Sequence, residues 1–323
     1  MINYKFFIIF LILEISLYAV GNKYREYTAK CMGTEFRILI DHDNEDLSQN
    51  AADSAFGEAN RLNQIFSDYI ADSEISLLSE SSFTGRKIKL SDELFEVLKY
   101  SKSFAIRTDN AFDPTIGQLS RLWRISRFRK SLPSEKSIHR ALSLKGIENL
   151  QLIEESKEVL LKKPGILLDL GGVAKGYAAD MMLRALNQSG VNRCLIDAGG
   201  DLTLGKRPRG ETGWKIEVGG KKHPDLPILS LENCSIATSG DSSQFVEING
   251  SRFSHIMNPA TGYGLKTLSQ VTIVAENGMK ADSLATACSV MGVSLTKQLS
   301  KKENFDAYFI IQTSEGKKLH ILN

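Results

Sequence analysis

An excess of charge of one sign is what this sequence most clearly lacks: 40 lysines and arginines against 38 aspartates and glutamates leave a formal net charge of +2 over 323 residues. A chain so close to neutral gives no electrostatic reason to expect nucleic acid as a partner. One basic stretch stands out, RLWRISRFRK at Arg121–Lys130. We interpret it as a loop or helix end whose arginines are solvated while Leu122 and Trp123 pack inward, because the chain offers no matching basic face elsewhere.

Cysteine is scarce as well, and its spacing excludes common metal sites. The four cysteines form neither a C-x-x-C pair nor a Cys/His pattern, which argues against a zinc or iron–sulfur centre. Most lie in apolar runs and are expected to be small buried residues. A disulfide stays possible outside the cytoplasm, and the sequence favours no pairing. The cysteines are Cys31, Cys194, Cys234 and Cys288.

Only one long hydrophobic run is present, at the N-terminus. Lys5 precedes about fifteen apolar residues, Phe6–Val20, interrupted by Glu14. This length is short for a membrane span and suits the apolar region of a signal peptide, with small residues at its end, at 19–21. We therefore predict a signal peptide over residues 1–21, with an uncleaved N-terminal membrane anchor as the alternative. Either reading places residues 22–323 outside the cytoplasm, in the periplasm or anchored to the outer face of the inner membrane.

Standard nucleotide fingerprints are missing too. The stretch LDLGGVAKGYAAD, Leu168–Asp180, resembles a glycine-rich phosphate loop at first sight. A P-loop needs a hydroxyl residue after its lysine, whereas Gly176 follows Lys175 here, and the glycines do not match the G-x-G-x-x-G spacing of dinucleotide-binding loops. These fingerprints therefore leave open what the loop holds.

No internal repeat, low-complexity tract or long linker divides the chain, whose length allows one large domain or two closely packed lobes. Helical periodicity is concentrated early and strands are mixed late, which favours an α+β fold over a doubly wound parallel sheet. The expected helices cover 46–66, 91–104, 173–189 and 278–291. The expected strands cover 27–40, 166–169, 194–197, 214–218, 228–237, 245–248, 268–275 and 307–311.

The sharpest local signal is ADSLATA, Ala281–Ala287. On a helix, Asp282 and Thr286 are four residues apart and lie on one face. A carboxylate and a hydroxyl are hard oxygen ligands that suit Mg²⁺. Taken alone, the pattern is equally typical of an aspartate that caps the helix and a threonine that bonds back to a carbonyl, and we favour that reading in isolation.

His255 is one of only five histidines and lies between Phe253 and Ile256 in an expected strand. Histidines in such settings are usually buried and hydrogen bonded. The turn that begins at Asn258-Pro259 nevertheless places this one at a strand end beside a possible cleft, where it could act as a general base near neutral pH.

Taken together, eight stretches make the chain resemble the ApbE family, the FAD:protein FMN transferases. Each stretch is modest alone, but they follow in the family's order from about residue 30 to about residue 290. They are MGT (32–34), SDYIADSEIS (67–76), AFDPTIGQL (111–119), LDLGGVAKGYAAD (168–180), IDAGGDL (196–202), ATSGD (237–241), SHIMNPATG (254–262) and ADSLATA (281–287).

The resemblance implies a single α+β unit of two closely packed lobes that binds FAD in a cleft, with Mg²⁺ at its pyrophosphate. Family members transfer the FMN half of FAD to a threonine hydroxyl of an acceptor protein and release AMP. The acceptor threonine lies in a short motif rich in Ser, Thr, Gly and Ala, for example in flavin-carrying subunits of membrane redox complexes.

Carried onto this chain, the resemblance assigns the metal to Asp282, Thr286 and the main-chain carbonyl of Ala174, which reverses the reading of ADSLATA in isolation. His255 matches the family's base. The implied FAD contacts are Met32 and Tyr69 at the flavin ring, Ala111, Phe112 and Asp113 at the adenosine or ring substituents, Gly171, Lys175 and Tyr177 near the phosphates or adenine, and Ile256 through its main chain.

Two departures from the family pattern affect flavin affinity and acceptor choice more than reaction type. Asn258 stands where the family commonly has an acidic residue, and residues 242–244 are Ser-Ser-Gln where an aromatic and a basic residue are usual. Two other functions stay open from the sequence: a Mg²⁺-dependent FAD pyrophosphatase that uses water in place of threonine, and an exported FAD-binding protein without enzymatic activity.

Overall fold

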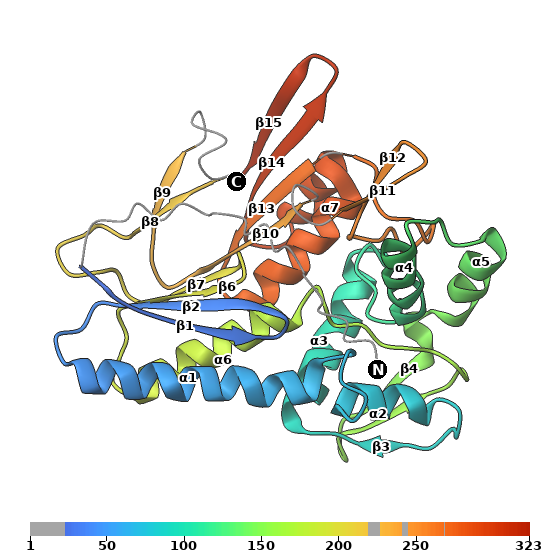
Figure 1. Cartoon of the computed structure of the whole chain (residues 1–323), viewed down its shortest axis with the longest axis horizontal. Helices are drawn as coiled ribbons and strands as arrows, with labels where there is room; N and C mark the ends of the chain where they lie inside the picture. Colours follow the sequence, from blue (N-terminus) through green and yellow to red (C-terminus); the bar gives the residue numbers. More distant parts are fainter. Residues whose placement is uncertain (1–22, 219–226, 241–244, 268) are drawn as a thin grey trace, which may run out of the picture.

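A computed structural model describes residues 23–218, 227–240, 245–267 and 269–323 (Figure 1). The predicted leader, residues 1–21, lies outside the described residues. Among the residues that the structure does describe, no helix is long and apolar enough to cross a membrane.

The fold is built on an eight-stranded sheet in which all neighbouring strands are antiparallel. Its register alternates apolar side chains between the two faces: Ile38 and Ile40 join one buried cluster, whereas Leu39 joins another. In spatial order the strands are β1 (Arg25–Cys31), β2 (Thr34–Ile40), β6 (Cys194–Ala198), β7 (Leu202–Leu204), β10 (Ser235–Gly240), β13 (Ser269–Ala275), β14 (Asp306–Thr313) and β15 (Gly316–Leu322).

Three helices cover one face of this sheet: α1 (Glu45–Phe66), α6 (Ala174–Gln188) and α7 (Gly278–Ser300) (Figure 1). Alanines Ala51, Ala55 and Ala59 of α1 are fully buried. Their small side chains let α1 pack closely on α6. The other face carries a two-stranded sheet, β8 (Trp214–Glu217) and β9 (Ile228–Leu231), which packs through Trp214.

A second lobe contains four helices and two small sheets. One buried cluster contains Leu94 and Leu98 of this lobe together with Ala281 and Leu284 of α7, so the two lobes share a core. The elements are α2 (Glu74–Ser81), β3 (Ile88–Lys89), α3 (Asp92–Arg107), α4 (Gly117–Arg129), α5 (Glu135–Leu144), a 3-10 turn (Ile147–Asn149), β4 (Leu150–Ile153), β5 (Glu158–Leu161), β11 (Phe245–Ile248) and β12 (Ser251–Ser254). The prediction of an α+β fold is confirmed.

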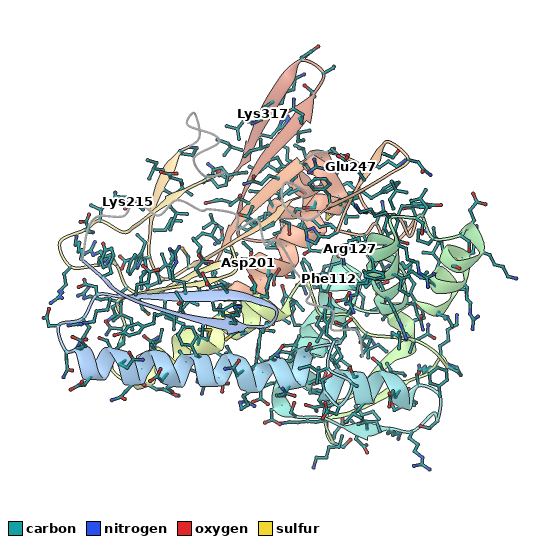
Figure 2. All side chains as sticks on the ribbon, in the orientation of Figure 1. Phe112, Arg127, Asp201, Lys215, Glu247 and Lys317 are labelled. Carbon is teal, nitrogen blue, oxygen red and sulfur yellow. The ribbon has the colours of Figure 1, made fainter. Side chains whose placement is uncertain are left out.

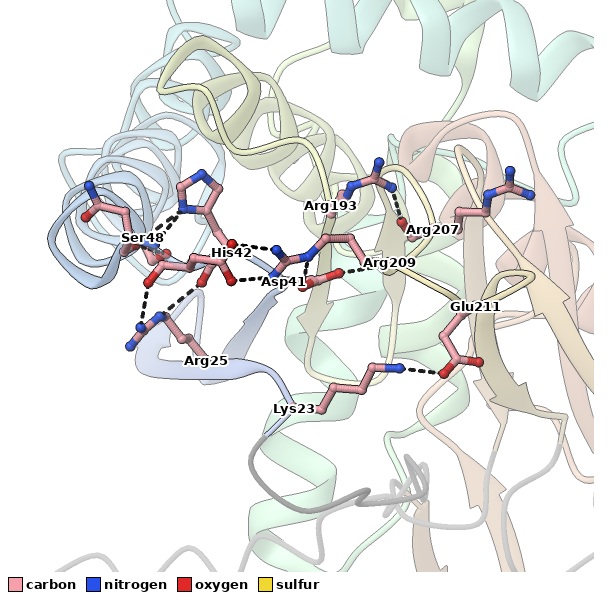
Figure 3. A network of polar contacts seen from close by, with 11 residues as sticks. Lys23, Arg25, Asp41, His42, Ser48, Arg193, Arg207, Arg209 and Glu211 are labelled. Atoms are coloured by element: carbon pink, nitrogen blue, oxygen red, sulfur yellow. Dashed lines mark hydrogen bonds and ion pairs between the residues drawn. The ribbon is translucent and has the colours of Figure 1, made fainter.

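Figure 2 shows Asp201 and Phe112 toward the middle of the molecule, whereas Lys215 and Lys317 lie toward its periphery. At the β1–β2 edge of the large sheet, a polar network fastens the loop before β8 (Figure 3). The Asp41 carboxylate, which is 6% exposed, accepts from the backbone N–H of Arg209 at 2.6 Å and from its Nε at 2.9 Å. Burial acts to raise the pKa of Asp41, but these hydrogen bonds hold it below its ordinary value.

The expected long helices are confirmed, including the end of one of them. Gly292 has φ 70° and ψ 178° inside α7, so the first helical segment stops at Met291, as expected. All four cysteines are unpaired, and three of them are buried.

Three expected strands differ in the structure. The stretch 27–40 is a hairpin whose turn residues, Met32 and Gly33, have φ of 48° and 79°. The apolar positions change from odd numbers (Tyr27, Ala29) before the turn to even numbers (Phe36, Ile38) after it, because the register pairs Ala29 with Phe36. The stretch 228–237 is likewise two strands, separated by a turn at Asn233 with φ 52°. The stretch 166–169 is not a strand and forms only one bridge, from Leu167 to Ile116.

Candidate functional site

The site is organised where α6 and α7 cross. A Cβ on Gly176 would lie 2.1 Å from the carbonyl oxygen of Gly278, so glycine lets the two backbones touch. The carboxylate of Asp180, at the end of the LDLGGVAKGYAAD stretch, accepts from the backbone N–H groups of Gly278 at 2.7 Å and Met279 at 2.9 Å. These bonds cap α7 from α6 and fix the position of Asp282 one turn further along.

Lys175 lies between two carboxylates. Its Nζ is 2.5 Å from Asp201 Oδ2 and 3.6 Å from Asp282 Oδ2. Asp282 is 4% exposed and also accepts from the backbone N–H of Gly176 at 3.1 Å. Burial raises the pKa of Asp282 to about 6 although the positive charge of Lys175 opposes it. Burial acts to lower the pKa of Lys175, but the two carboxylates outweigh burial and raise it.

Two of the predicted metal ligands, Asp282 and Thr286 on α7, lie close to the glycine loop and the start of α6. A Cβ on Gly172 would lie 2.8 Å from Thr286 Oγ1. Glycine at this position therefore allows the backbone of the loop to lie close to that hydroxyl. Ala174 follows in the same loop as the first residue of α6 and is buried. The structure thus brings the Asp282 carboxylate and the Thr286 hydroxyl to the loop that bears Ala174.

This donor set fits a hard divalent cation. Mg²⁺ takes oxygen ligands of the kind found here, namely a carboxylate, a hydroxyl and a nearby backbone carbonyl. The local charge also suits a cation, because Asp201 and Asp282 already surround the positively charged ammonium of Lys175. Within the described part of the chain no group of three or more His, Cys, Asp or Glu residues could hold a metal. A site with a single carboxylate ligand would not be found by searching for such groups.

Asp201 connects this cluster to two further motifs. Its Oδ1 accepts from the backbone N–H of Thr238 at 3.2 Å, which ties the ATSGD strand to Lys175. Beside it, Gly199 has φ 69°, and a Cβ there would lie 2.5 Å from Thr34 Cγ2. The tip of the β1–β2 hairpin, which carries Met32 in a left-handed conformation, is therefore packed against the IDAGGDL turn.

Tyr69 is 74% exposed and is held by an arginine outside all eight motifs. The guanidinium carbon of Arg124 lies 3.9 Å from the centre of the Tyr69 ring. The same guanidinium donates to Asp68 at 2.5 Å and lies 4.0 Å from Asp169. Burial and the neighbouring Asp169 raise the pKa of Asp68, and the two carboxylates raise that of Arg124 against the effect of burial.

The AFDPTIGQL stretch runs beside the glycine loop. The backbone N–H of Asp169 donates to the carbonyl of Pro114 at 2.8 Å. Asp113 is buried, accepts from the backbone N–H of Thr115 at 2.8 Å, and pairs with Lys145 at 3.3 Å. Phe112 is buried and Ala111, next to it, is half-buried.

Tyr177 does not join Lys175 but lies on another side of α6. Its hydroxyl donates to Glu96 at 3.0 Å, and its ring packs edge-on against Phe66. It lines a cavity of about 420 Å³ with Glu58, Glu93 and other residues of α1, α3 and α6. Burial and the hydrogen bond with Glu96 raise its pKa. Its expected contact with FAD stays a prediction.

Gly171 is exposed, and its N–H donates to the Asp169 carboxylate at 2.7 Å. Because Arg124 lies near the same aspartate, this link joins the exposed edge of the glycine loop to the Tyr69 side chain.

The SHIMNPATG stretch packs on α4, where Trp123 Nε1 donates to the carbonyl of Gly262 at 2.8 Å. His255 is half-buried and follows β12 in a bend. Both main-chain groups of Ile256 are hydrogen bonded, the N–H to Ser254 Oγ and the carbonyl to the N–H of Leu265.

The departure at Asn258 has a structural explanation. Its Oδ1 accepts from the backbone N–H groups of Ala260 at 2.9 Å and Thr261 at 3.3 Å. An amide oxygen serves this turn as a carboxylate oxygen would. The other departure, at 242–244, lies outside the described residues, as does Asp241.

Sequence reasoning missed Arg124, Asp169 and Asp201 as members of the site. Asp169 and Asp201 lie inside the recognised stretches, so their carboxylates could have been noted. Arg124 gave no signal beyond its place in the basic stretch, because its contact with Tyr69 spans 55 residues of sequence.

Comparison with known proteins shows the family of the chain. The model of the ApbE family matches residues 32–309. The chain belongs to the ApbE family. The FAD:protein FMN transferase of Escherichia coli K12 is 28% identical over 299 residues, covering 89% of this chain and 83% of the relative.

Two further relatives extend the comparison. The FAD:protein FMN transferase of Chlamydia muridarum is 34% identical over 250 residues, which cover 76% of this chain and 75% of the relative. The structure is similar to that of a mutant of the flavin transferase ApbE from Vibrio cholerae, with a TM-score of 0.82, 25% identity, and coverage of 92% and 97% of the two chains.

Proposed function

We propose that this ApbE-family chain transfers the FMN moiety of FAD to a threonine hydroxyl of an acceptor protein and releases AMP, with Mg²⁺ as cofactor. The observation that carries the proposal is the meeting of Asp282, Thr286 and the loop bearing Ala174 beside Lys175. The names of the family's curated relatives support flavin transfer from FAD to protein.

The reaction forms a bond between the threonine oxygen and the phosphorus of FMN, and it breaks the pyrophosphate bond to AMP. The threonine proton must be accepted as its oxygen attacks, and we assign that step to His255 because an imidazole accepts protons near neutral pH. Bound at Asp282, Thr286 and the carbonyl of Ala174, Mg²⁺ would neutralise charge on the pyrophosphate and improve AMP as a leaving group.

The protein's own groups would hold FAD in place. Tyr69 presents an exposed ring that the Arg124 guanidinium fixes, which suits stacking on the flavin ring. The Lys175 ammonium offsets part of the negative charge of Asp201 and Asp282, which would otherwise repel the pyrophosphate. Gly171 is exposed on the loop, where its backbone can approach a ligand closely.

Incubation of the purified chain with FAD, Mg²⁺ and candidate acceptors, read by intact mass, tests the proposal. We expect one acceptor to gain the mass of an FMN moiety and AMP to appear in equal amount. AMP formed at the same rate without acceptor would indicate an FAD pyrophosphatase instead. Retention of FAD with no AMP, although Mg²⁺ is present, would indicate a flavin-binding protein.

We further propose that the chain works outside the cytoplasm, with flavin-carrying subunits of membrane redox complexes as acceptors that present a Thr-containing motif. The apolar run at Phe6–Val20 supports export. Fractionation of cells, with an antibody to detect the protein, tests the proposed location separately. Recovery of the protein in the cytoplasmic fraction would contradict the location but not the proposed reaction.

A further inference from the structure

The helices α4 and α5 with their connecting turn, residues 117–145, carry charge that the rest of the molecule does not share. This segment holds eight lysines and arginines and one glutamate, a net charge of +7, while the whole chain has +2. The remaining residues therefore carry a net charge of −5. Figure 1 shows α4 and α5 at one end of the molecule, and Figure 2 labels Arg127 in this region.

Most of these cations are not neutralised by neighbouring carboxylates. Arg124 pairs with Asp68, and Lys145 pairs with Asp113. Along the described ranges, no ion pair is formed by the other six: Arg121, Arg127, Arg129, Lys130, Lys136 and Arg140. Cations in the last turn of a helix interact favourably with its dipole, which accounts for Arg127 and Arg129 but not for the others.

Large apolar side chains are exposed among these cations. Phe128 is 79% exposed, Ile125 43% and Leu132 39%. Ile125 and Phe128 are three residues apart on α4 and share a face, while Trp123 is buried against Phe253 on the other side. Solvation of the arginines does not account for this face, because neighbouring exposed apolar side chains are typical of an interaction surface.

We propose that this face of α4 and α5 docks on an anionic phospholipid surface. Lipid phosphates complement the six cations, and the acyl region receives Phe128, Ile125 and Leu132. Phe128 protrudes with most of its surface free, which suits a soft, deformable partner better than a rigid one. The attachment proposed here is peripheral, because it uses side chains on the surface of α4 and its connection to α5.

Docking through this face would hold the candidate functional site in a fixed orientation relative to the membrane. Arg124 lies on α4 and contacts Tyr69 and Asp169, so a membrane that covers the exposed face of α4 lies next to the loop of the ApbE site. The proposal concerns a folded surface and is independent of the N-terminal apolar run and of the reaction.

The test places a fluorescent reporter on the face. The substitution Phe128→Trp in the full chain introduces an exposed indole, and the two native tryptophans are buried, at 3% and 2% exposure. We expect a blue shift of its emission with vesicles of phosphatidylcholine containing about 30 mol% phosphatidylglycerol, and none with phosphatidylcholine alone. The shift should disappear at about 1 M salt, where charges are screened within a few ångströms.

Substitution of three cations measures how much positive charge contributes to vesicle binding. Adding Arg121→Gln, Arg129→Gln and Lys130→Gln to the reporter should weaken partitioning about a hundredfold, since each cation near an anionic surface contributes about fivefold. These side chains are exposed and form no ion pair within the described residues, so an unchanged thermal transition is expected to confirm that folding is intact.

The matched control lies on the β14–β15 hairpin, away from α4 (Figure 2). Leu319 is 41% exposed beside Lys317 and Lys318, and Lys318 pairs with Glu315. A Leu319→Trp reporter should not respond to the vesicles. An equal response there, or vesicle binding through the N-terminal run that leaves the reporter at position 128 unshifted, overturns the proposal. So does a reporter that responds to polyglutamate but not to vesicles, which would assign the face to an acidic protein.

Discussion

At the scale of single residues, the site is a balance of charges contributed by distant parts of the sequence. Lys175 Nζ lies 2.5 Å from Asp201 and 3.6 Å from Asp282. Removal of the lysine would leave two buried carboxylates facing each other, and removal of one carboxylate would leave the ammonium with a single partner. The effect of a substitution here therefore depends on which partner stays behind.

Asp282→Asn is expected to reduce FMN transfer about a hundredfold or more, because the amide removes the one carboxylate among the proposed Mg²⁺ ligands. Thr286→Val should give a smaller loss, and Thr286→Ser should retain much of the activity because it keeps the hydroxyl. The measurement is the transfer rate as a function of Mg²⁺ concentration. Thr296→Val, at a buried threonine of α7 beyond the kink at Gly292, serves as control and should leave the Mg²⁺ dependence unchanged.

Arg124 tests how the Tyr69 ring is held. Arg124→Lys keeps the charge near Asp68 and Asp169 but loses the planar group over the ring, so we expect FAD to bind about tenfold more weakly with little change in the catalytic rate at saturation. Titration of flavin fluorescence gives the affinity. Arg121→Lys, one turn earlier and exposed, is the control, and an equal loss in both variants would contradict this role for Arg124.

At the scale of elements, the crossing of α6 and α7 fixes the metal-ligand positions relative to the loop. The backbone contact at Gly176 and Gly278 leaves no room for a side chain. The Asp180 carboxylate then holds the first turn of α7 through two N–H groups. Backbone contacts and directional hydrogen bonds restrict the distance and angle between two helices more tightly than apolar packing does.

Gly176→Ala is expected to destabilise the protein by about 3 kcal/mol, because a Cβ 2.1 Å from a carbonyl oxygen forces the helices apart. Gly57→Ala is the matched control. Gly57 is an exposed glycine inside α1 where an added Cβ would meet no atom within 4 Å, so alanine there should stabilise by up to about 1 kcal/mol. Denaturant unfolding of both variants gives the comparison. A tolerated alanine at 176 would show that the crossing can relax.

Asp180 makes stability depend on pH. Burial raises its pKa to about 6 in the folded protein, from an ordinary value of 3.8, although two backbone N–H groups act to lower it. The folded state therefore binds the proton more tightly, and stability decreases as pH rises from about 4 to about 6. The difference in unfolding free energy between the wild type and Asp180→Asn should shift by up to about 3 kcal/mol over this interval, to the disadvantage of the wild type. Urea unfolding of both proteins at several pH values measures this difference, and a difference that does not change with pH would contradict the role of Asp180.

The same elements show what the sequence could predict. The long helices follow from periodicity over many residues, and Gly292 marks the end of the first segment of α7. The turn at Met32-Gly33 was not predicted, although the change of the apolar positions from odd to even numbers marks it. The stretch 166–169 is apolar like a strand, yet it is covered by neighbouring segments and forms a single bridge.

For the site, too, the sequence predicted local relations between residues but not contacts between distant segments. The common face of Asp282 and Thr286 follows from helical spacing, but their meeting with the Gly172–Ala174 loop followed only from the family resemblance. The ion pair between Lys175 and Asp201 depends on the order of strands in the sheet. No local pattern reports such an order, so these contacts had to come from the folded structure.

At the scale of the whole molecule, the eight motifs form a connected set of contacts across both lobes. Gly199 packs on Thr34, Thr238 and Lys175 bond to Asp201, and Trp123 binds the carbonyl of Gly262. A ligand that bridges these motifs is therefore expected to stabilise the entire fold rather than one lobe, because the lobes also share a core.

FAD and Mg²⁺ together are accordingly expected to raise the thermal transition as a single cooperative event. A ligand at a hundred times its dissociation constant stabilises by about 2.7 kcal/mol, which corresponds to a shift of about 5 °C for a chain of this size. FAD without Mg²⁺ should give a smaller shift, and Asp282→Asn should remove the difference between the two conditions. Calorimetry distinguishes the alternatives: two separate transitions, only one of them sensitive to FAD, would mean that the ligand binds a single lobe and that the motifs do not act as one site.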